Sequence, residues 1–382
     1  MTEGAEARVV GAFPAKLAVI ILALFGAALT LAYSLPHHWT PYEARDYSTY
    51  WLAGRMALDG SDPYDSASLA AALRGLSGST VQPYFSYPPH ALLLFVPLGA
   101  LPIGISFWTY QAIGFGLFII AARPQLRDGL PLVAILSPAA LISFSFGQSG
   151  MLVGALWLFA FSGSAAALAA LTIRPQLGLL AGLEGFQSGT ALRSICIMAA
   201  VAGMTSMFFG LEVWKSWFDQ LLVHSKFLNS NVIFYRQSPV PVVGYGIAGW
   251  VLFGGAGLYF LSRAFNVFTA ATATFLIAPH GLHYDMTIVC FGCAVLLFNS
   301  WDRSQLLQRV ALTLGFLSPA LVYFGTWFAP PILLVALHAQ VQLTRRTSQD
   351  SAALADSERN SGSGLSFTRW KRAPPRKELN SD

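Results

Sequence analysis

The sequence predicts an all-α polytopic membrane protein. Of its 382 residues, 55% are hydrophobic and only 11% are charged, whereas soluble domains carry about 25% charged residues. Apolar runs long enough to cross a bilayer as helices recur along most of the chain. Five of the eighteen acidic residues gather in one polar stretch at 34–89. Because ionised groups are costly inside the bilayer, such a stretch between crossings is where chemistry is expected.

The first apolar run, Leu17–Tyr33, is long enough for one crossing. A cleaved signal peptide is the alternative, but the following residues 34–38 make a poor cleavage site, so we interpret the run as a retained helix. Further apolar runs predict crossings near 103–122, 130–146, 149–164, 194–210, 243–261, 265–279, 284–299, 306–323 and 327–342.

The segment 165–186 has the length of one crossing but carries Arg174-Pro175 in its middle. Proline removes a backbone donor and kinks a helix, and arginine at mid-membrane is costly unless it faces a cavity. We therefore predict two short helical arms that meet at Arg174-Pro175-Gln176, like the broken helices that reach binding sites in transporters. With these arms, the bundle has about 10–12 transmembrane helices.

Positive charge in the short loops predicts the orientation. With the N-terminus inside, the inner side receives Arg8, Lys16, Arg123, Arg127, Arg193, Arg263, Arg303 and Arg309. Both termini are then cytoplasmic in the inner (plasma) membrane, and the long loops 34–102 and 211–242 face outward. Residues 1–342 form the membrane domain. Residues 343–382 are predicted to be a disordered basic tail that can touch anionic membrane lipids. We therefore interpret the net charge of +5 as a consequence of the membrane topology and not as a sign of nucleic-acid binding.

The stretch 46–58 predicts an amphipathic helix on the membrane surface, with Asp46 at its start. Asp46 is then either a helix cap that accepts from backbone N–H groups or a general base held close to the membrane plane. The residues alone leave both interpretations open. Asp62-Pro63-Tyr64-Asp65 is typical of a turn followed by a second helix start, which favours structural roles for these two acids.

Under this orientation, polar residues embedded in apolar sequence fall at the outward ends of crossings, which predicts a single site there. They are Asp46, Tyr87-Pro88-Pro89, Gly147-Gln148, Arg174-Pro175-Gln176 and the segment Pro279–Asp285. Arg174 needs an anionic partner, which is either a bound phosphate or an internal ion pair with Glu184 or Asp285. Gln148 and Gln176 offer donors to phosphate or hydroxyl groups.

Two groups of potential metal ligands are better explained without a metal. His280, His283 and Asp285 do not follow a recognised ligand spacing, so hydrogen bonding to a ligand is favoured. Cys290 and Cys293 lie i, i+3 on one predicted helix with no second pair or nearby histidine, which favours packing. We expect neither a metal nor a cofactor.

The motifs, taken in order, resemble the glycosyltransferase 87 family over about residues 17–342. They are Asp46-Tyr47-x-x-Tyr50-Trp51-x-Ala53, Asp62-Pro63-Tyr64, Tyr87-Pro88-Pro89, Gly147-Gln148, Arg174-Pro175-Gln176 and Pro279-His280…Tyr284-Asp285. No single motif is specific, but the ordered set is. The chain departs from the family pattern at Arg174, where Lys is commoner, and slightly in the His280–His283 spacer. The resemblance therefore does not identify the sugar.

The resemblance implies a GT-C type bundle with an extracytoplasmic loop carrying interfacial helices. It implies an inverting transferase that moves one mannose- or arabinofuranose-type sugar from a polyprenyl-phosphate donor to a lipid or glycan acceptor on the extracytoplasmic face, with Asp46 as general base. The sequence agrees, because it shows no phosphate-cradling glycine loop, no soluble α/β domain and no convincing Asp-x-Asp motif. The candidate substrate-binding residues are Arg45, Tyr50, Tyr87, Gln148, Arg174, Gln176, His280, His283, Tyr284 and Asp285.

Two other functions compete with this interpretation. A transporter or flippase of a lipid-linked sugar is expected to show inverted repeats and a site at the membrane midplane. The sequence shows no clear repeat, and the predicted site lies at one face. A ligase that attaches a whole glycan is expected to have a larger and more cationic outer loop.

Overall fold

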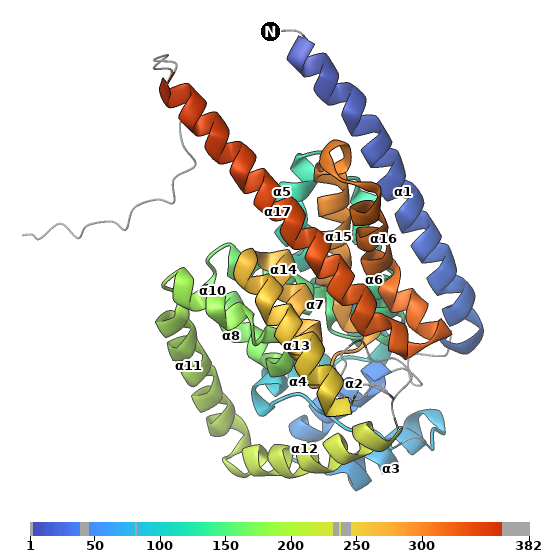
Figure 1. Cartoon of the computed structure of the whole chain (residues 1–382). Coiled ribbons are helices and arrows are strands. Elements are labelled where there is room, and N and C mark those ends of the chain that lie inside the picture. The colour runs from blue at the N-terminus through green and yellow to red at the C-terminus, as the bar shows by residue number, and fades with distance from the viewer. Residues whose placement is uncertain (1–2, 39–45, 81, 232–236, 238–245, 361–382) are drawn as a thin grey trace, which may run out of the picture. The chain divides into compact units, whose positions relative to one another are not determined.

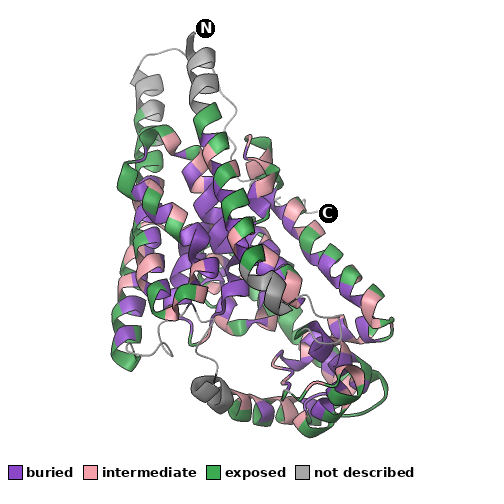
Figure 2. Ribbon diagram, turned by 90° about the vertical axis from the view of Figure 1, so that its right-hand side faces the viewer, coloured by how far each residue is buried: buried purple, intermediate pink, exposed green. Residues whose placement is uncertain are grey.

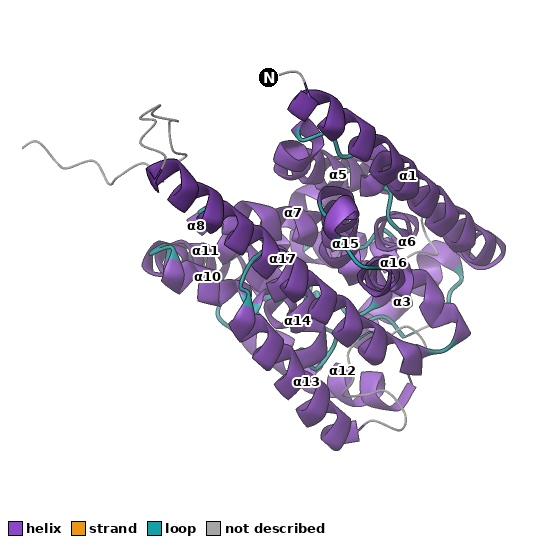
Figure 3. Cartoon of the chain, turned by 45° about the horizontal axis from the view of Figure 1, so that its top comes forward, coloured by secondary structure: helices purple, strands orange, loops and turns teal. Residues whose placement is uncertain are grey.

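The computed structural model describes residues 3–38, 46–80, 82–231, 237 and 246–360. These residues form seventeen α-helices with short 3-10 turns between them, and no strand occurs in the described ranges (Figure 3). The predicted all-α fold class is confirmed. Residue contacts divide the chain into two units, Met1–Leu343 and Thr344–Asp382.

Apolar helices make the chain a membrane protein. Within the described ranges, four helical stretches are long and apolar enough to cross a bilayer: Phe13–Ala32, Ile103–Arg127, Ala191–Phe209 and Leu306–Phe324. The predicted crossings at 149–164, 265–279 and 284–299 instead contain the shorter apolar helices Gly150–Phe161, Val267–Ile277 and His283–Asn299. Side chains such as Leu192 and Met207 stay 73% and 88% exposed on the third stretch, as expected where lipid is the solvent.

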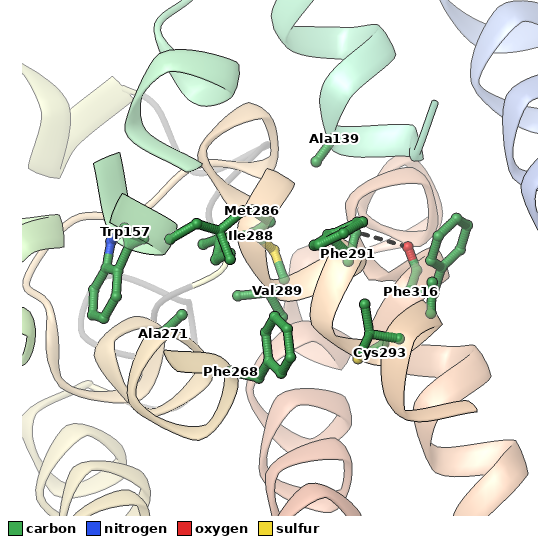
Figure 4. Packing of buried hydrophobic residues seen from close by; sticks show 14 of the residues in the cluster. Ala139, Trp157, Phe268, Ala271, Met286, Ile288, Val289, Phe291, Cys293 and Phe316 are labelled. Carbon is green, nitrogen blue, oxygen red and sulfur yellow. Dashed lines mark hydrogen bonds between the residues drawn. The ribbon is translucent and has the colours of Figure 1, made fainter. Parts of the chain in front are cut away.

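The centre of the first unit is built around α15 (Thr287–Asn299). This helix contacts α1 (Glu3–His38), α6 (Pro138–Phe146), α7 (Gly150–Phe161), α14 (Val267–Ile277) and α16 (Leu306–Leu321). Its residues from Thr287 to Val295 are all buried (Figure 2). Ile288, Phe291 and Cys293 lie in the same cluster as side chains of α14 and α16 (Figure 4). This core holds in place the segments that precede α7 and α15.

The paired cysteines belong to this core. Cys290 and Cys293 are both buried and free. The Cys290 thiol donates to the Phe316 carbonyl oxygen at 3.3 Å, the bond that Figure 4 draws as a dashed line. Their place in the centre of the apolar cluster is the packing role that their spacing predicts.

A second cluster is formed by α2 (Asp46–Leu58), α3 (Ser66–Ser77), the 3-10 turn η2 (Pro89–Ala91), α4 (Leu92–Gly99) and α5 (Ile103–Arg127). Glycines let α2 and α4 touch backbone to backbone. A Cβ atom at Gly54 would lie 2.1 Å from the Phe95 carbonyl oxygen, and one at Gly99 would lie 2.5 Å from the Arg55 nitrogen. No larger side chain fits at either position without moving a helix.

Helix α2 has the predicted bounds, but its packing differs from the prediction. Eight of its thirteen residues are buried, including Tyr47 and Tyr50, so protein covers most of its sides. A helix on a surface is expected to have one buried and one exposed face. This division is absent in α2, because the helix packs against both α4 and α5. The structural roles of the two following acids are confirmed. Asp62 accepts from the Tyr64 backbone N–H at 2.9 Å, and Asp65 caps α3.

The predicted helix break at Arg174 is confirmed. Helix α8 (Ala165–Ala170) and the 3-10 turn η4 (Leu171–Ile173) precede it, and α9 (Pro175–Gly178) and α10 (Ala181–Gln187) follow it. Arg174 itself has φ −131° and ψ 70°, outside the helical region. Pro175 occupies the first turn of α9, where its missing N–H costs nothing. Arg174 therefore lies between two helical segments and not within a continuous helix.

Helix α11 (Ala191–Phe209) is followed by α12 (Glu212–Asn231), which packs on the second cluster, and by α13 (Gly246–Arg263), which packs on α14 (Figure 1). The last helix, α17 (Ala329–Asn360), corrects the predicted tail. The sequence predicts disorder from residue 343, whereas the helix continues to Asn360. Residues 344–360 contain neither glycine nor proline, so nothing in them interrupts the helix. The rest of the predicted tail lies outside the described residues.

Candidate active site

Five segments far apart in the sequence meet around the side chain of Gln148. They are the start of α2, the residues before η2, the α6–α7 connection, the break at Arg174 and the turn before α15. The amide nitrogen of Gln148 donates to Asp46 Oδ2 at 2.7 Å. Its amide oxygen accepts from the Tyr50 hydroxyl at 2.6 Å and from Arg174 Nη2 at 3.0 Å. One amide thus joins a carboxylate to a guanidinium.

Arg174 is buried and is held by neutral groups. Its Nη2 also donates to the Tyr87 hydroxyl at 2.9 Å, and its Nε donates to Ser149 Oγ at 3.3 Å. The guanidinium carbon lies 4.5 Å from the centre of the Tyr87 ring, a cation–π distance. The Tyr87 hydroxyl donates in turn to Ser149 Oγ at 2.7 Å. These contacts orient the cation without neutralising it.

Asp285 attracts Arg174 without pairing with it. Each group acts on the other through its field, but no hydrogen bond or ion pair joins them in the described part of the chain. Asp285 Oδ2 instead accepts from the Leu282 backbone N–H at 3.1 Å, which closes the 3-10 turn η5 (His283–Met286). Of the two acids considered as internal partners of Arg174, Glu184 and Asp285, the second therefore does not form an ion pair with it. The charge remains available to an anionic ligand.

Glycines bring the α6–α7 connection into the site. Gly147 ends α6 with φ +72°, a left-handed conformation that favours glycine. A Cβ atom there would lie 2.5 Å from the Tyr47 Cβ, so glycine is also needed for the approach of α2. A Cβ atom at Gly150 would lie 2.0 Å from the Tyr284 carbonyl oxygen. Gln148 and Ser149 are thereby held between α2 on one side and η5 on the other.

The carboxyl group of Asp46 has a shifted pKa. Asp46 keeps exposed surface as a residue, although protein surrounds its carboxyl group. The protein packed around its carboxyl group raises its pKa above the ordinary value, while the hydrogen bond from Gln148 and the charge of Arg174 act in the opposite direction. A carboxylate with a raised pKa is a better proton acceptor, which suits a general base.

Two of the remaining predicted site residues, His283 and Tyr284, lie in the turn before α15. Tyr284 lies within electrostatic range of Asp46 and Arg174, so it belongs to the site. His283 is buried among the rings of Phe146, Tyr284 and Tyr323, with centroid distances of 5.3–6.1 Å.

His280 and Gln176 are half-buried. Arg45 lies outside the described residues. Nowhere in the described ranges do three metal-ligating side chains come together.

Two functional positions were missed by the sequence analysis. Ser149 contacts both Arg174 and Tyr87, and its place directly after Gly147-Gln148 was the available signal. His224 of α12 lies 2.5 Å from Ser86, through Nδ1 and Oγ, and stacks on Tyr84. No spacing in the sequence links His224 to a segment almost 140 residues away.

An apolar pocket of about 250 Å³ lies beside the helix break. It lies among α8, α9, α10 and α11, and Leu171, Thr172 and Pro175, which flank Arg174, form part of its wall. The Thr172 hydroxyl is 3.1 Å from His90 Nε2. The break thus carries a buried cation and borders a space lined by hydrocarbon.

The fold and the site define a helical membrane protein in which one amide joins a buried cation to a carboxylate at a polar site. Residues 85–322 match the model of glycosyltransferase family 87. That is more than half of the chain, which therefore belongs to glycosyltransferase family 87 and is a glycosyltransferase. Tyr87, Gln148, Arg174 and Asp285 lie inside the matched region, whereas Asp46 precedes it. Comparison with curated proteins and with solved structures gave no match.

Proposed function

We propose that this glycosyltransferase transfers a single mannose- or arabinofuranose-type sugar from a polyprenyl-phosphate donor to a hydroxyl group of a lipid or glycan acceptor, with inversion at the anomeric carbon. The observation that carries the proposal is the bridge from Asp46 through Gln148 to Arg174. In this bridge a carboxylate and a guanidinium lie on either side of one amide, which supports assigning them as proton acceptor and phosphate-binding group.

The proposed reaction is a single displacement. Asp46 accepts the proton of the acceptor hydroxyl while the acceptor oxygen forms a bond to the anomeric carbon. The bond from that carbon to the phosphate oxygen breaks, and polyprenyl phosphate leaves with the electron pair. Arg174 stabilises the charge that develops on the leaving phosphate. Tyr87 and Ser149 keep the guanidinium oriented throughout, since both contact it.

The decisive experiment is transfer by the purified full-length protein in detergent from synthetic polyprenyl-phosphate mannose, arabinofuranose and glucose. We expect transfer of one sugar from a mannose- or arabinofuranose-type donor and an inverted anomeric configuration in the product. The alternative function, a transporter or flippase of the lipid-linked sugar, predicts donor translocation in proteoliposomes without a glycosylated product. Translocation alone would overturn the proposal.

The acidic limb of the pH–rate profile is expected to move when Gln148 is replaced by Leu. The base form of Asp46 is lost as the pH falls through its pKa, and the Gln148 hydrogen bond lowers that pKa. Gln148→Leu removes the bond, raises the pKa of Asp46 and shifts the limb to higher pH. Gln176→Leu is the matched control, because Gln176 is not bonded to Asp46. An unshifted limb in Gln148→Leu would show that Asp46 is not the titrating base.

The apolar pocket supports a prenyl chain on the donor, because Thr172 and Pro175, close to Arg174 in the chain, form part of its wall. Gly182 lines the pocket, and a Cβ atom there meets nothing within 4 Å. Gly182→Phe is expected to raise KM roughly tenfold for a long-chain donor by excluding part of the chain, with little effect on a donor with a short chain. Gly203→Phe, on the exposed side of α11, is the control. Equal effects on both donors would place the prenyl chain elsewhere.

We further propose that the site faces the extracytoplasmic side of the inner membrane and that both termini are cytoplasmic. The support is the positive charge of the short loops on the opposite side. In a cysteine-free background, Ser61→Cys, between α2 and α3, is expected to react with an impermeant thiol reagent in intact cells. Ala352→Cys, on α17, is expected to react only after the membrane is opened. Labelling of both positions from the same side would overturn this orientation.

A further inference from the structure

Helix α12 covers the segment that carries Tyr87. Val213 and Trp217 on one face of the helix belong to the cluster that contains Phe85 and Tyr87. His224, eleven residues after Val213 and therefore on the same face, stacks on the Tyr84 ring, with centroids 4.6 Å apart and planes 13° apart. The helix thus contacts residues on the N-terminal side of Tyr87 through several side chains.

Polar contacts from α12 reach both the residue before Tyr87 and the backbone of Tyr87 itself. The Nδ1 atom of His224 is hydrogen-bonded to Ser86 Oγ at 2.5 Å. One turn earlier, Gln220 donates to the Tyr64 carbonyl oxygen at 3.0 Å, and the Tyr64 hydroxyl donates to the Tyr87 carbonyl oxygen at 2.8 Å. The Tyr87 backbone is therefore restrained directly by Tyr64 and, through Ser86, by His224.

Tyr87 is one of the three side chains that orient Arg174. The Tyr87 hydroxyl accepts from Arg174 Nη2, and the guanidinium lies over the Tyr87 ring. A displacement of Tyr87 would remove one hydrogen bond and the cation–π contact together. A buried cation with fewer restraints binds a phosphate less well, because part of the binding free energy must then order the side chain.

His224 can hold Ser86 without adding charge to the site. Burial, together with the charge of Arg174, lowers the pKa of His224 to about 4. The imidazole is therefore neutral at physiological pH, and Arg174 remains the cation that faces the ligand. The field of Arg174 also shows that the histidine is close to the site, although it belongs to a different loop of the sequence.

We infer that His224 is a positioning residue of the transferase, which fixes Ser86 and Tyr87 and thereby orients the Arg174 guanidinium toward the phosphate of the donor. The inference rests on the proposed function, since it assigns the ligand of Arg174. It gives α12, in the second long loop, a part in donor binding that the sequence did not reveal. The ligand whose binding His224 would affect is the phosphate group of a lipid-linked donor.

The test compares three replacements of His224 in the full-length protein. An Asn side chain places a polar atom close to the position of Nδ1, whereas a Gln side chain places one close to Nε2. His224→Ala and His224→Gln are expected to raise the donor KM about tenfold with kcat changed less than twofold, because the hydrogen bond to Ser86 and the order it imposes are lost. His224→Asn is expected to restore the parent KM. Asp219→Asn, on the exposed side of α12, is the control.

Ser86→Ala provides an independent check. It is expected to raise KM as His224→Ala does, and the double variant is expected to be no worse than either single variant, because both remove one interaction. Additive effects, an unchanged KM in His224→Ala, or equal behaviour of the Asn and Gln variants would overturn the inference. If the parent protein transfers no sugar, the proposed function fails by itself. In that case the affinity of the same variants for polyprenyl phosphate tests the inference. Weaker binding by His224→Ala and His224→Gln, but not by His224→Asn, supports it. Equal binding by all three variants and the parent protein overturns it.

Discussion

Asp46→Asn is expected to lower kcat for sugar transfer by about 10²–10⁴-fold, the range typical of losing a general base. The donor KM is expected to change little, because the amide cannot accept the acceptor proton but has nearly the same shape. An Asn oxygen can still accept from Gln148 Nε2, which now bonds Asp46 Oδ2 at 2.7 Å. The bridge to Arg174 is thus retained while the proton acceptor is removed. The measurement is steady-state transfer from the donor that the parent protein uses.

Asp65→Asn is the matched control for this variant. Asp65 belongs to the same polar stretch, but its carboxylate accepts from Ser68 and from the Ala67 backbone N–H at the start of α3. Asn is also a good helix cap, so this substitution is expected to leave both stability and transfer near the parent values. Normal transfer by Asp46→Asn would remove Asp46 from the mechanism. Loss of transfer in both variants would point instead to a role for the loop as a whole.

The local elements of the site were predictable from the sequence because local chemistry determines them. Proline disfavours the helical conformation of the residue before it, and the observed break falls at Arg174, directly before Pro175. The bounds of α2 and the capping role of Asp65 likewise follow from side chains that act within a few residues. These features needed no knowledge of how the helices pack.

The contacts between these elements were not predictable, because they join residues far apart in the chain. The Gln148 amide meets Tyr50 across 98 residues and Asp46 across 102. The enclosure of α2 depends on Gly54 and Gly99 meeting across a helix pair, which a single sequence does not reveal. For the same reason the sequence did not reveal that the rings of Phe146 and Tyr323 lie around His283.

The site also differs from the prediction in how its charges are arranged. The sequence left open whether Arg174 is neutralised by an internal ion pair. The structure places neutral acceptors around Arg174. Asp46 lies at the other end of the bridge and is separated from Arg174 by the Gln148 amide. This separation keeps the two charges from neutralising each other, and a base that is not paired with the cation remains free to accept a proton.

Arg174→Gln is expected to raise the donor KM by about 10–100-fold and to lower kcat as well. A hydrogen bond to a charged group contributes about 1.5–3 kcal/mol, and each 1.4 kcal/mol is a factor of ten. The loss extends to kcat because the charge on the phosphate grows as the glycosidic bond breaks. Arg193→Gln, which removes an exposed cation from α11, is the control for net charge.

Arg174→Lys separates the charge from the orientation of the guanidinium. Lysine keeps a cation at this position, but it cannot contact Gln148, Tyr87 and Ser149 together with the planar fork that arginine uses here. We therefore expect a KM between those of the parent and Arg174→Gln. The same order is expected for the affinity for polyprenyl phosphate, measured without acceptor. If Arg174→Gln binds polyprenyl phosphate as tightly as Arg193→Gln does, the phosphate is held elsewhere, and the bridge from Asp46 to Arg174 is structural.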